Sequence, residues 1–471
     1  MNLRTELLDH QRDAVAKTLP TRIGALFMEM GTGKSRTAIE LVDRREERVD
    51  HVVWFCPVSL KETIRQEILK HTDCTDVDIH VFGDKTNEKT LPKCLWYIVG
   101  IESMSASNRV VLTVNKLITE RSMVIVDESS YIKGHKAMRT QRITHISQKA
   151  RYRLILTGTP ISQGVVDLFA QMRFLSPKIL GYNSFYSFAR NHLEYSEKYP
   201  GMIVRSHNVE YLAVKIQPYV YQVTKDECLD LPDKLYETRY FSMTGEQRET
   251  YERAKEEILL ETPEEDFDSI TIFRLFTALQ SIVCGFWNRK PKGGKVEHIE
   301  LNHRRVDVLL DTVTSIPTGE KVIIWAKYQH DIREIGEALR EQFGDDSISL
   351  FHGGLNEKQR SQQVERFRKE ARFFLATQSC GGHGLTLNEA HYVIYYNNAF
   401  KYSERLQSED RCHRIGQNHK VVYIDIQCSG SIDDRIANAL ATKGSVVEAF
   451  KREVDKVKGK KGRLKKLMEA L

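Results

Sequence analysis

Long hydrophobic runs are missing from this sequence. Apolar stretches such as 52–58 and 322–326 are only as long as strands, whereas a transmembrane helix needs roughly 18 consecutive apolar residues or more. The opening MNLRTELLDHQRD also lacks the apolar core of a signal peptide. We therefore expect no membrane association and a cytoplasmic protein, in the host cytosol if the source is viral.

Cysteine pairs of the C-x-x-C type are also missing. The eight cysteines are scattered, which disfavours a disulfide framework or a cysteine-based zinc site and is typical of buried thiols in a reducing compartment. Internal repeats and low-complexity blocks are absent as well. With 471 residues, 41% hydrophobic and 28% charged, the chain suits two or three globular domains.

An excess of either charge is missing from the body of the chain. The net charge is +6, and residues 451–471 hold nine Lys or Arg against three acids, so the first 450 residues hold 61 of each sign. The basic tail fits either a nonspecific nucleic-acid anchor or a solvated, partly disordered end.

Two stretches alternate short apolar strands with amphipathic helices, the pattern of a doubly wound parallel sheet. We therefore predict an α/β fold with an N-terminal lobe at 1–180 and a C-terminal lobe at 301–430. Between them, 181–300 reads as a helical protrusion, expected to project from the first sheet, and a linker. Residues 431–471 read as a helix followed by the basic tail.

The strongest local motif follows the apolar segment 23–28, where Gly31-Thr32-Gly33-Lys34-Ser35 leads into an amphipathic helix. Glycines let backbone N–H groups turn toward phosphates, and the helix N-terminus adds partial positive charge. Lys34 can reach the β- and γ-phosphates of ATP, and the Ser35 hydroxyl can bind Mg²⁺. The strict phosphate-loop pattern would need glycine at Met28, so this loop is a variant.

Two further strand ends carry polar residues. The apolar segment 123–126 runs into Asp127 and Glu128, where Asp127 can hold Mg²⁺ and Glu128 can polarise the attacking water. The segment RLIL runs into Thr157-Gly158-Thr159-Pro160, whose hydroxyls can sense the γ-phosphate. Each motif alone also fits an ordinary solvated turn.

A polar cluster, QSEDRCHRIGQ, precedes the last apolar strand. Arg411 and Arg414 suit an arginine finger, because a guanidinium can neutralise charge on the transferred phosphoryl group. A surface salt-bridge cluster is the alternative.

The ordered set MGTGKS, DESS, LTGTP, GGHGL and QSEDRCHRIGQ resembles the Swi/Snf-type branch of the superfamily 2 helicase-like ATPases. The resemblance covers residues 1–445 or so. It implies two RecA-like lobes with ATP in the cleft, duplex DNA running across both, and translocation that need not separate the strands. It also implies that Asp433 and Asp434 begin a C-terminal helical brace.

The resemblance assigns further residues. Gln11 matches the glutamine that reads adenine, and Gly384 lies in a glycine-rich motif along the DNA track and is counted with the cofactor-binding residues. Gln407, with Thr157 and Thr159, is assigned to coupling. The expected DNA contacts are Ser59, Lys133, Thr377, Gln378, Ser379 and Phe400.

Departures from the family pattern point to a divergent stand-alone member, phage or bacterial in origin. Asn397 and Ala399 replace acids, and Phe400 replaces a tryptophan. The Phe400 ring is expected in the minor groove, with a place in the core as the alternative.

Three functions remain open from the sequence. The leading one is a DNA-stimulated ATPase that tracks along double-stranded DNA as a monomer, gripping phosphates rather than bases and serving repair, fork processing or protein displacement. The others are a strand-separating DNA or RNA helicase and an ATP-gated DNA clamp with negligible turnover. A further protein partner is left open.

Overall fold

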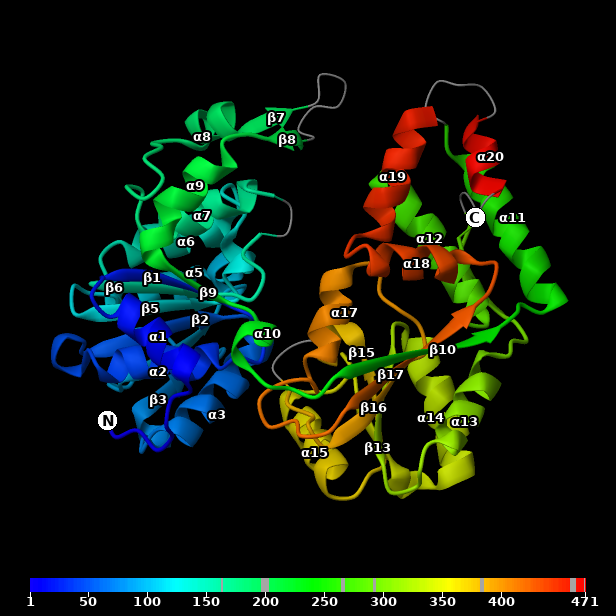
Figure 1. Cartoon of the computed structure of the whole chain (residues 1–471), viewed down its shortest axis with the longest axis horizontal. Helices are drawn as coiled ribbons and strands as arrows, with labels where there is room; N and C mark the ends of the chain where they lie inside the picture. Colours follow the sequence, from blue (N-terminus) through cyan, green and yellow to red (C-terminus); the bar gives the residue numbers. More distant parts are fainter. Residues whose placement is uncertain are drawn as a thin grey trace. The chain divides into compact units, whose positions relative to one another are not determined.

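The computed structural model describes residues 1–161, 164–195, 203–263, 267–290, 294–381, 385–457, 463–469 and 471. The chain forms two compact units, Met1–Asp230 and Leu231–Leu471, and each has a parallel sheet with helices on both faces (Figure 1). Within the described residues, no helix combines the length and the apolar character needed to cross a membrane.

The first unit contains a seven-stranded sheet in which every pairing is parallel. The strand order is β3 (Ile79–Val81), β4 (Trp96–Gly100), β2 (His51–Cys56), β5 (Ser122–Asp127), β6 (Tyr152–Leu156), β1 (Ile23–Met28) and β9 (Val220–Val223). A small antiparallel pair joins β7 (Leu193–Tyr195) to β8 (Ile203–Ser206). The helices are α1 (Asp9–Thr18), α2 (Lys34–Asp43), α3 (Lys61–His71), α4 (Ser103–Ala106), α5 (Asn108–Leu117), α6 (Met138–Ser147), α7 (Val166–Leu175), α8 (Phe185–His192), α9 (Val209–Ile216) and α10 (Lys225–Cys228).

The second unit contains a six-stranded sheet, again parallel throughout. Its order is β10 (Lys234–Phe241), β17 (Val421–Cys428), β16 (Ala390–Tyr395), β13 (Lys321–Ala326), β15 (Phe373–Thr377) and β14 (Ile348–Phe351). An antiparallel hairpin joins β11 (Phe286–Arg289) to β12 (Glu297–Glu300). The helices are α11 (Gly245–Glu261), α12 (Ser269–Val283), α13 (Arg305–Ser315), α14 (Gln329–Phe343), α15 (Glu357–Lys369), α16 (Gln378–Gly381), α17 (Tyr402–Glu409), α18 (Ile432–Ala441), α19 (Val446–Val457) and α20 (Arg463–Glu469).

Alternation along each central strand produces a separate core on each face of the sheet. In β5, Val124 and Val126 pack on one face, whereas Met123 and Ile125 pack on the other. Strands buried on both faces read as continuous apolar runs, which is why the sequence revealed them. The expected α/β fold with two parallel sheets is confirmed.

The division of the chain differs from the expected boundaries at 180 and 301. Strand β9 extends the first sheet, and β10 extends the second by pairing along its whole length with β17. Most side chains of β10 are exposed or half-buried, because it is an edge strand. Its sequence, KLYETRYF, therefore lacks the apolar run that marks the central strands.

The helical segment between the sheets also lies differently from the expectation that it projects from the first sheet. Helices α11 and α12 belong to the second unit. Phe276 of α12 packs against Phe450 of α19, and both helices share one core with α18. The described end of the basic tail is folded, since Met468 and Leu471 are buried in that core.

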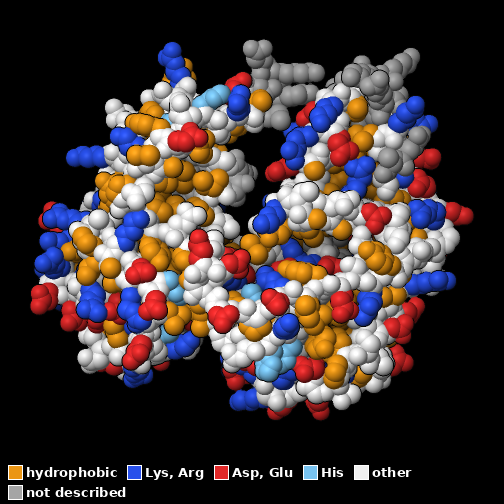
Figure 2. All heavy atoms as spheres, in the orientation of Figure 1, with side chains coloured by type: hydrophobic (Ala, Val, Ile, Leu, Met, Phe, Trp, Pro, Cys, Tyr) orange, Lys and Arg blue, Asp and Glu red, His pale blue; other side chains and the backbone are white. Residues whose placement is uncertain are grey.

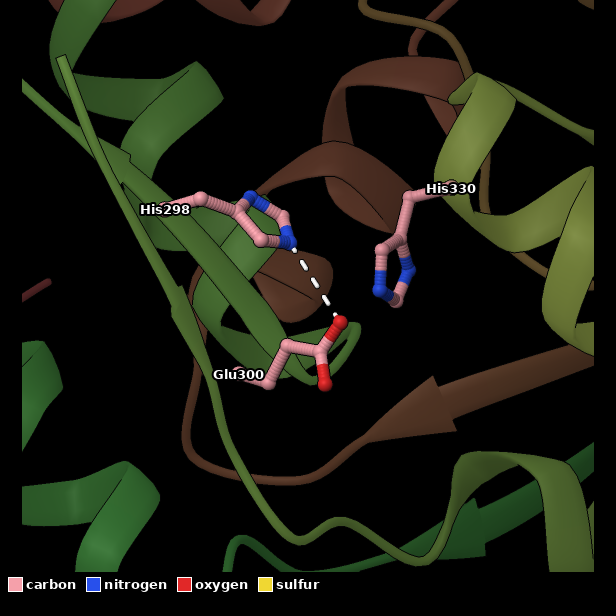
Figure 3. A group of neighbouring side chains, drawn as sticks. All are labelled: His298, Glu300 and His330. Atoms are coloured by element: carbon pink, nitrogen blue, oxygen red, sulfur yellow. Dashed lines mark ion pairs between the residues drawn. The ribbon is translucent and has the colours of Figure 1, made fainter.

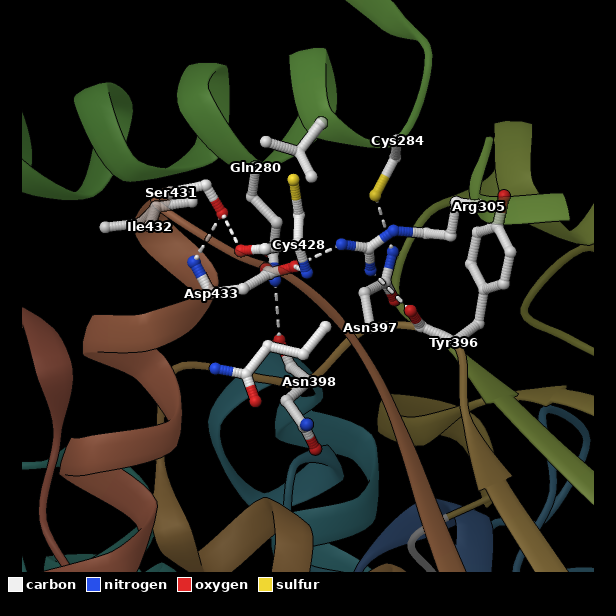
Figure 4. Close-up of polar contacts among 12 residues, drawn as sticks. Gln280, Cys284, Arg305, Tyr396, Asn397, Asn398, Cys428, Ser431, Ile432 and Asp433 are labelled. Atoms are coloured by element: carbon white, nitrogen blue, oxygen red, sulfur yellow. Dashed lines mark hydrogen bonds and ion pairs between the residues drawn. The ribbon is translucent and has the colours of Figure 1, made fainter. Parts of the chain in front are cut away.

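The C-terminal helices are anchored by a buried ion pair, shown in Figure 4. Arg305, at the start of α13, has 0% exposure and donates both to the Asp433 carboxylate and to the Tyr396 carbonyl oxygen. Asp433, in the first turn of α18, also accepts a hydrogen bond of 3.0 Å from the Cys428 N–H. This pair joins α18 to the start of α13 within the second unit.

Candidate active site

The loop between β1 and α2 has the backbone of a phosphate-binding loop. Gly31 and Gly33 adopt φ angles of 81° and 86°, a left-handed region that disfavours any side chain with a Cβ. Thr32 between them is buried, and its hydroxyl donates to the Glu29 carbonyl oxygen at 2.7 Å. Because Gly33 has no side chain to cap α2, the N-terminus of this helix suits an anionic ligand.

Lys34 is the first residue of α2, and its ammonium lies over the loop. It donates to the carbonyl oxygens of Met28 at 2.9 Å and Glu29 at 3.2 Å. Its charge partly opposes the rise in the pKa of Asp127 that burial and Glu128 cause, so the ammonium and the carboxyl group lie close enough to interact. Ser35 follows in the first turn and is half-buried.

Asp127 ends β5, and the residue is 6% exposed. Burial, and next the negative charge of Glu128, raise the pKa of Asp127 to about 7. A buried carboxyl group beside a second carboxylate suits a divalent cation, whose positive charge would offset the two effects that raise the pKa. The chemistry of this carboxyl group therefore fits Mg²⁺, which Asp127 and Ser35 would hold according to the sequence prediction.

Glu128 has a left-handed backbone, with φ 48° and ψ 57°. Its N–H donates to the Asp127 Oδ1 at 2.9 Å, which locks the turn between the two carboxylates. A non-glycine residue in this region is uncommon and is often found at functional sites.

The third motif packs directly on the phosphate loop. The Thr157 N–H donates to the Leu26 carbonyl oxygen at 3.1 Å, and the Thr157 hydroxyl accepts from the Thr159 N–H at 3.1 Å. A Cβ added to Gly158 would lie 3.1 Å from the Met30 nitrogen, so this glycine permits the close approach. The sequence interpretation gave a role to the two threonines and none to Gly158.

A buried glutamine of α7 links the second motif to the third. Gln171 has 0% exposure, and its Oε1 accepts from the Ser129 hydroxyl at 2.6 Å. Its Nε2 donates to the carbonyl oxygens of Pro160 and Asp167, both at 2.9 Å. Nothing in the sequence marked this residue, because it lies 42 positions beyond Ser129 inside an apolar helix.

Gln11 contacts the phosphate loop. Its Nε2 donates to the Thr32 carbonyl oxygen at 3.1 Å, and its Oε1 accepts from the Leu8 N–H at 3.1 Å. His10, which the sequence interpretation did not select, reaches the same Thr32 oxygen at 2.8 Å. The segment before β1 is thus tied to the loop.

In the second unit, Arg411 and Arg414 lie together. Both guanidinium groups donate to the Leu385 carbonyl oxygen, at 3.4 and 3.3 Å. Arg411 is 7% exposed and also donates from Nε to the Gln407 carbonyl oxygen at 2.9 Å. The structure therefore brings the two candidate arginines and Gln407 to one place, whereas Gly384 lies outside the described residues.

Of the six expected DNA contacts, two are exposed, one is partly exposed and three, including Phe400, are buried. Ser59 and Ser379 are exposed, and the Lys133 side chain is 28% exposed with its ammonium 3.6 Å from Asp167. Thr377 and Gln378, at the carboxyl end of β15, are buried. Within the described part of the chain, the Thr377 hydroxyl and both amide atoms of Gln378 have no hydrogen-bond partner.

Charge on the surface is mixed. Figure 2 shows lysine and arginine side chains interspersed with acidic ones over the visible face. This agrees with the balanced charge of the first 450 residues.

Phe400 requires a correction, because the structure places it in the core. Its side chain is 5% exposed and packs edge-on against Phe273 and Phe276. The Lys327 ammonium lies 3.0 Å from its ring centroid. A ring packed in this way does not reach a DNA groove, so the alternative of a core residue holds.

Comparisons with known proteins agree with these observations. Residues 14–285 match the model of the SNF2-related domain, and residues 304–416 match that of the helicase conserved C-terminal domain. An uncharacterized ATP-dependent helicase of Mycoplasma genitalium is 26% identical over 69% of this chain and 30% of its own length. The human DNA annealing helicase and endonuclease ZRANB3 is 25% identical over 98% of this chain and 42% of its own length.

A solved structure, the Sulfolobus solfataricus SWI2/SNF2 ATPase core in complex with dsDNA, is 22% identical. The match covers 94% of this chain and 92% of that one, with a TM-score of 0.44. The chain spans less than half the length of the two curated relatives.

Proposed function

The chain belongs to the SNF2-related family, and on that basis we propose that it hydrolyses ATP to move along double-stranded DNA. The observation that carries the proposal is the joint placement of Lys34 and Asp127. The phosphate loop and the carboxylate pair lie at the carboxyl ends of β1 and β5, and the Lys34 charge acts on the Asp127 carboxyl group. Ligands of parallel sheets bind at this edge.

In this proposal, the loop holds the phosphates of ATP. A phosphate oxygen replaces the carbonyl oxygens of Met28 and Glu29 as the acceptor for the Lys34 ammonium, since a charged acceptor forms the stronger hydrogen bond. The N–H groups of Gly31, Thr32 and Gly33 line the phosphates. Mg²⁺, when bound by Ser35 and Asp127, supplies positive charge for the transferred phosphoryl group.

Glu128 orients the attacking water and accepts its proton, and its locked backbone fixes the direction of the carboxylate. Arg411 and Arg414 act as arginine fingers on the same γ-phosphate, since a permanently charged guanidinium stabilises the transition state. Gln11 donates to the Thr32 carbonyl oxygen and so holds the phosphate loop in place, and it supports adenine recognition.

Thr157, Thr159 and Gln407 couple the nucleotide state to DNA binding, with Gly158 and Gln171 as additional positioning residues. Loss of the γ-phosphate would change the contacts of the phosphate loop. Gly158 packs against that loop, so the change can reach the segment that contains Thr157 and Thr159. Gln171 then connects the same segment to the turn after Glu128.

For the DNA side, we propose that Ser59, Lys133, Thr377, Gln378 and Ser379 contact phosphates. Hydroxyl and amide groups bind phosphate oxygens without reading bases, which suits movement along any sequence. Among the described residues, the Gln378 amide has no hydrogen-bond partner, and a buried amide in that state costs about 1–3 kcal/mol, which a hydrogen bond to a phosphate oxygen would lower. The name of the human relative, a DNA annealing helicase aligned over nearly the whole chain, favours DNA over RNA.

The first test is steady-state ATP hydrolysis with and without duplex DNA. We expect stimulation by duplex DNA that weakens as salt rises, and loss of turnover in Lys34→Ala and Glu128→Gln. The exposed residues Lys17 and Glu47 provide matched controls, as Lys17→Ala and Glu47→Gln should keep wild-type rates. A rate of ATP hydrolysis that is the same with and without duplex DNA would refute the proposal.

The second test separates translocation from strand separation. Displacement of a third strand from a long duplex in the presence of ATP supports translocation. Unwinding of a forked duplex without triplex displacement would instead assign a strand-separating helicase, and nucleotide-dependent DNA binding without phosphate release would assign a clamp.

A further inference from the structure

Two histidines and a glutamate from two elements of the second unit, β12 and α14, lie close together, as Figure 3 shows. His298 and Glu300 are two positions apart on β12, so both side chains project from the same face of the strand. His330 comes from the first turn of α14. One potential ligand atom from each residue lies within 4.8 Å of the other two.

The spacing is close to that of a tetrahedral metal centre. With metal–ligand bonds of roughly 2.0–2.2 Å, neighbouring ligand atoms lie about 3.4 Å apart. The His298 Nε2 and the Glu300 Oε1 are already 3.5 Å apart. His330 needs a shift of roughly 1 Å, which rotation of exposed or half-buried side chains can supply.

Neighbouring residues orient the two imidazole rings. The Nδ1 of His298 lies 2.7 Å from the Asn288 Oδ1, an acceptor for an Nδ1 proton, so the neutral ring would present its Nε2 lone pair to an ion on the Glu300 side. The His330 ring stacks on Phe286, with centroids 4.3 Å apart. Support of this kind, with one ring nitrogen donating to an amide oxygen, accompanies metal-binding histidines.

The surroundings are acidic. A cavity of about 330 Å³ adjoins the cluster, and its lining includes Glu246, Glu300, Glu334 and Glu337 with Arg333 as the one basic residue among the lining groups described. Four carboxyl groups against one guanidinium produce a negative potential that concentrates cations.

We propose that His298, Glu300 and His330 form a binding site for a divalent transition-metal ion of the zinc class, separate from the nucleotide site. Two imidazoles and one carboxylate are the ligands that Zn²⁺ prefers, whereas Mg²⁺ and Ca²⁺ prefer oxygen ligands alone. Three protein ligands leave a fourth position for water. The ion joins the β11–β12 hairpin to α14 and thereby fixes the hairpin to the second lobe.

The test is titration of the metal-free full chain with Co²⁺, whose visible absorption bands report ligand geometry, followed by displacement with Zn²⁺. We expect one equivalent of Co²⁺ with tetrahedral bands, no displacement by excess Mg²⁺, and loss of the bands in His298→Ala and His330→Ala. Asn288→Ala should weaken binding by about 10- to 100-fold. The matched control is His145→Ala, which removes an exposed histidine of the first unit and should bind normally.

A second readout is thermal unfolding of the second unit. Zn²⁺ should raise its midpoint in the wild-type chain, because an ion that binds only the folded state stabilises it, and should leave the midpoint of His298→Ala unchanged. Since His298 is exposed, its removal should not disturb folding. Absence of a Co²⁺ band in the wild-type chain, or a band that survives both histidine substitutions, would overturn the proposal.

Discussion

Replacement of Asp127 by asparagine should stabilise the free chain above pH 7. The asparagine side chain keeps the shape of the carboxyl group and removes its charge. Burial and the neighbouring Glu128 raise the pKa of Asp127 from 3.8 to about 7. At about 1.36 kcal/mol per pKa unit, the ionised buried form costs at most ~4 kcal/mol of folding free energy.

The sign of the pH dependence follows from the direction of the shift. The folded chain binds this proton more tightly than the unfolded chain does, so the associated stability is fully present below pH 3.8 and is lost as pH rises through about 7. Asp127→Asn has no ionisable group at this position, so its stability does not depend on this titration. The variant and the wild-type chain should therefore have similar stability near pH 4, and the variant should be the more stable one above pH 7.

Hydrogen–deuterium exchange of peptides from β2 and β5 measures this difference within the first unit, with both chains compared at the same pH. Mg²⁺ with nucleotide should slow exchange in the wild-type chain at alkaline pH and do little in Asp127→Asn. Asp84→Asn, at an exposed position, is the control. A stability difference between variant and wild type that does not change with pH would refute the reasoning.

Three further predictions address other parts of the structure. Gln171→Leu keeps the side-chain volume but leaves the buried Ser129 hydroxyl without its acceptor, so the free energy of unfolding should fall by about 1–3 kcal/mol. The stimulation of ATP hydrolysis by DNA should fall more than the basal rate does. Arg414→Ala should lower kcat for ATP hydrolysis by about 10³-fold in steady-state assays. A loss of tenfold or less would indicate that Arg411, rather than Arg414, is the arginine finger. Arg305→Met should destabilise the second unit by about 3–5 kcal/mol, because it leaves the Asp433 charge buried and unpaired. Denaturant unfolding should show much of that loss recovered in Arg305→Met with Asp433→Leu.

The sequence was informative wherever function depends on neighbouring residues. The segment from Gly31 to Ser35 forms its loop because two glycines and a helix start are contiguous, so the pattern and the structure coincide. Asp127 and Glu128 were found for a similar reason, since both follow a strand that is buried on both faces and hence continuously apolar. These local rules also predicted the two parallel sheets.

Only the tertiary structure decided the features that depend on contacts between distant segments. An aromatic residue has the same local pattern in a DNA groove and in a core, and it is the packing of α12 that buries Phe400. Strand β10 was hidden because an edge strand needs no apolar run. Gln171, and the cluster formed by His298 with His330, have no local signature at all, since each is defined by a partner that chain folding brings within reach.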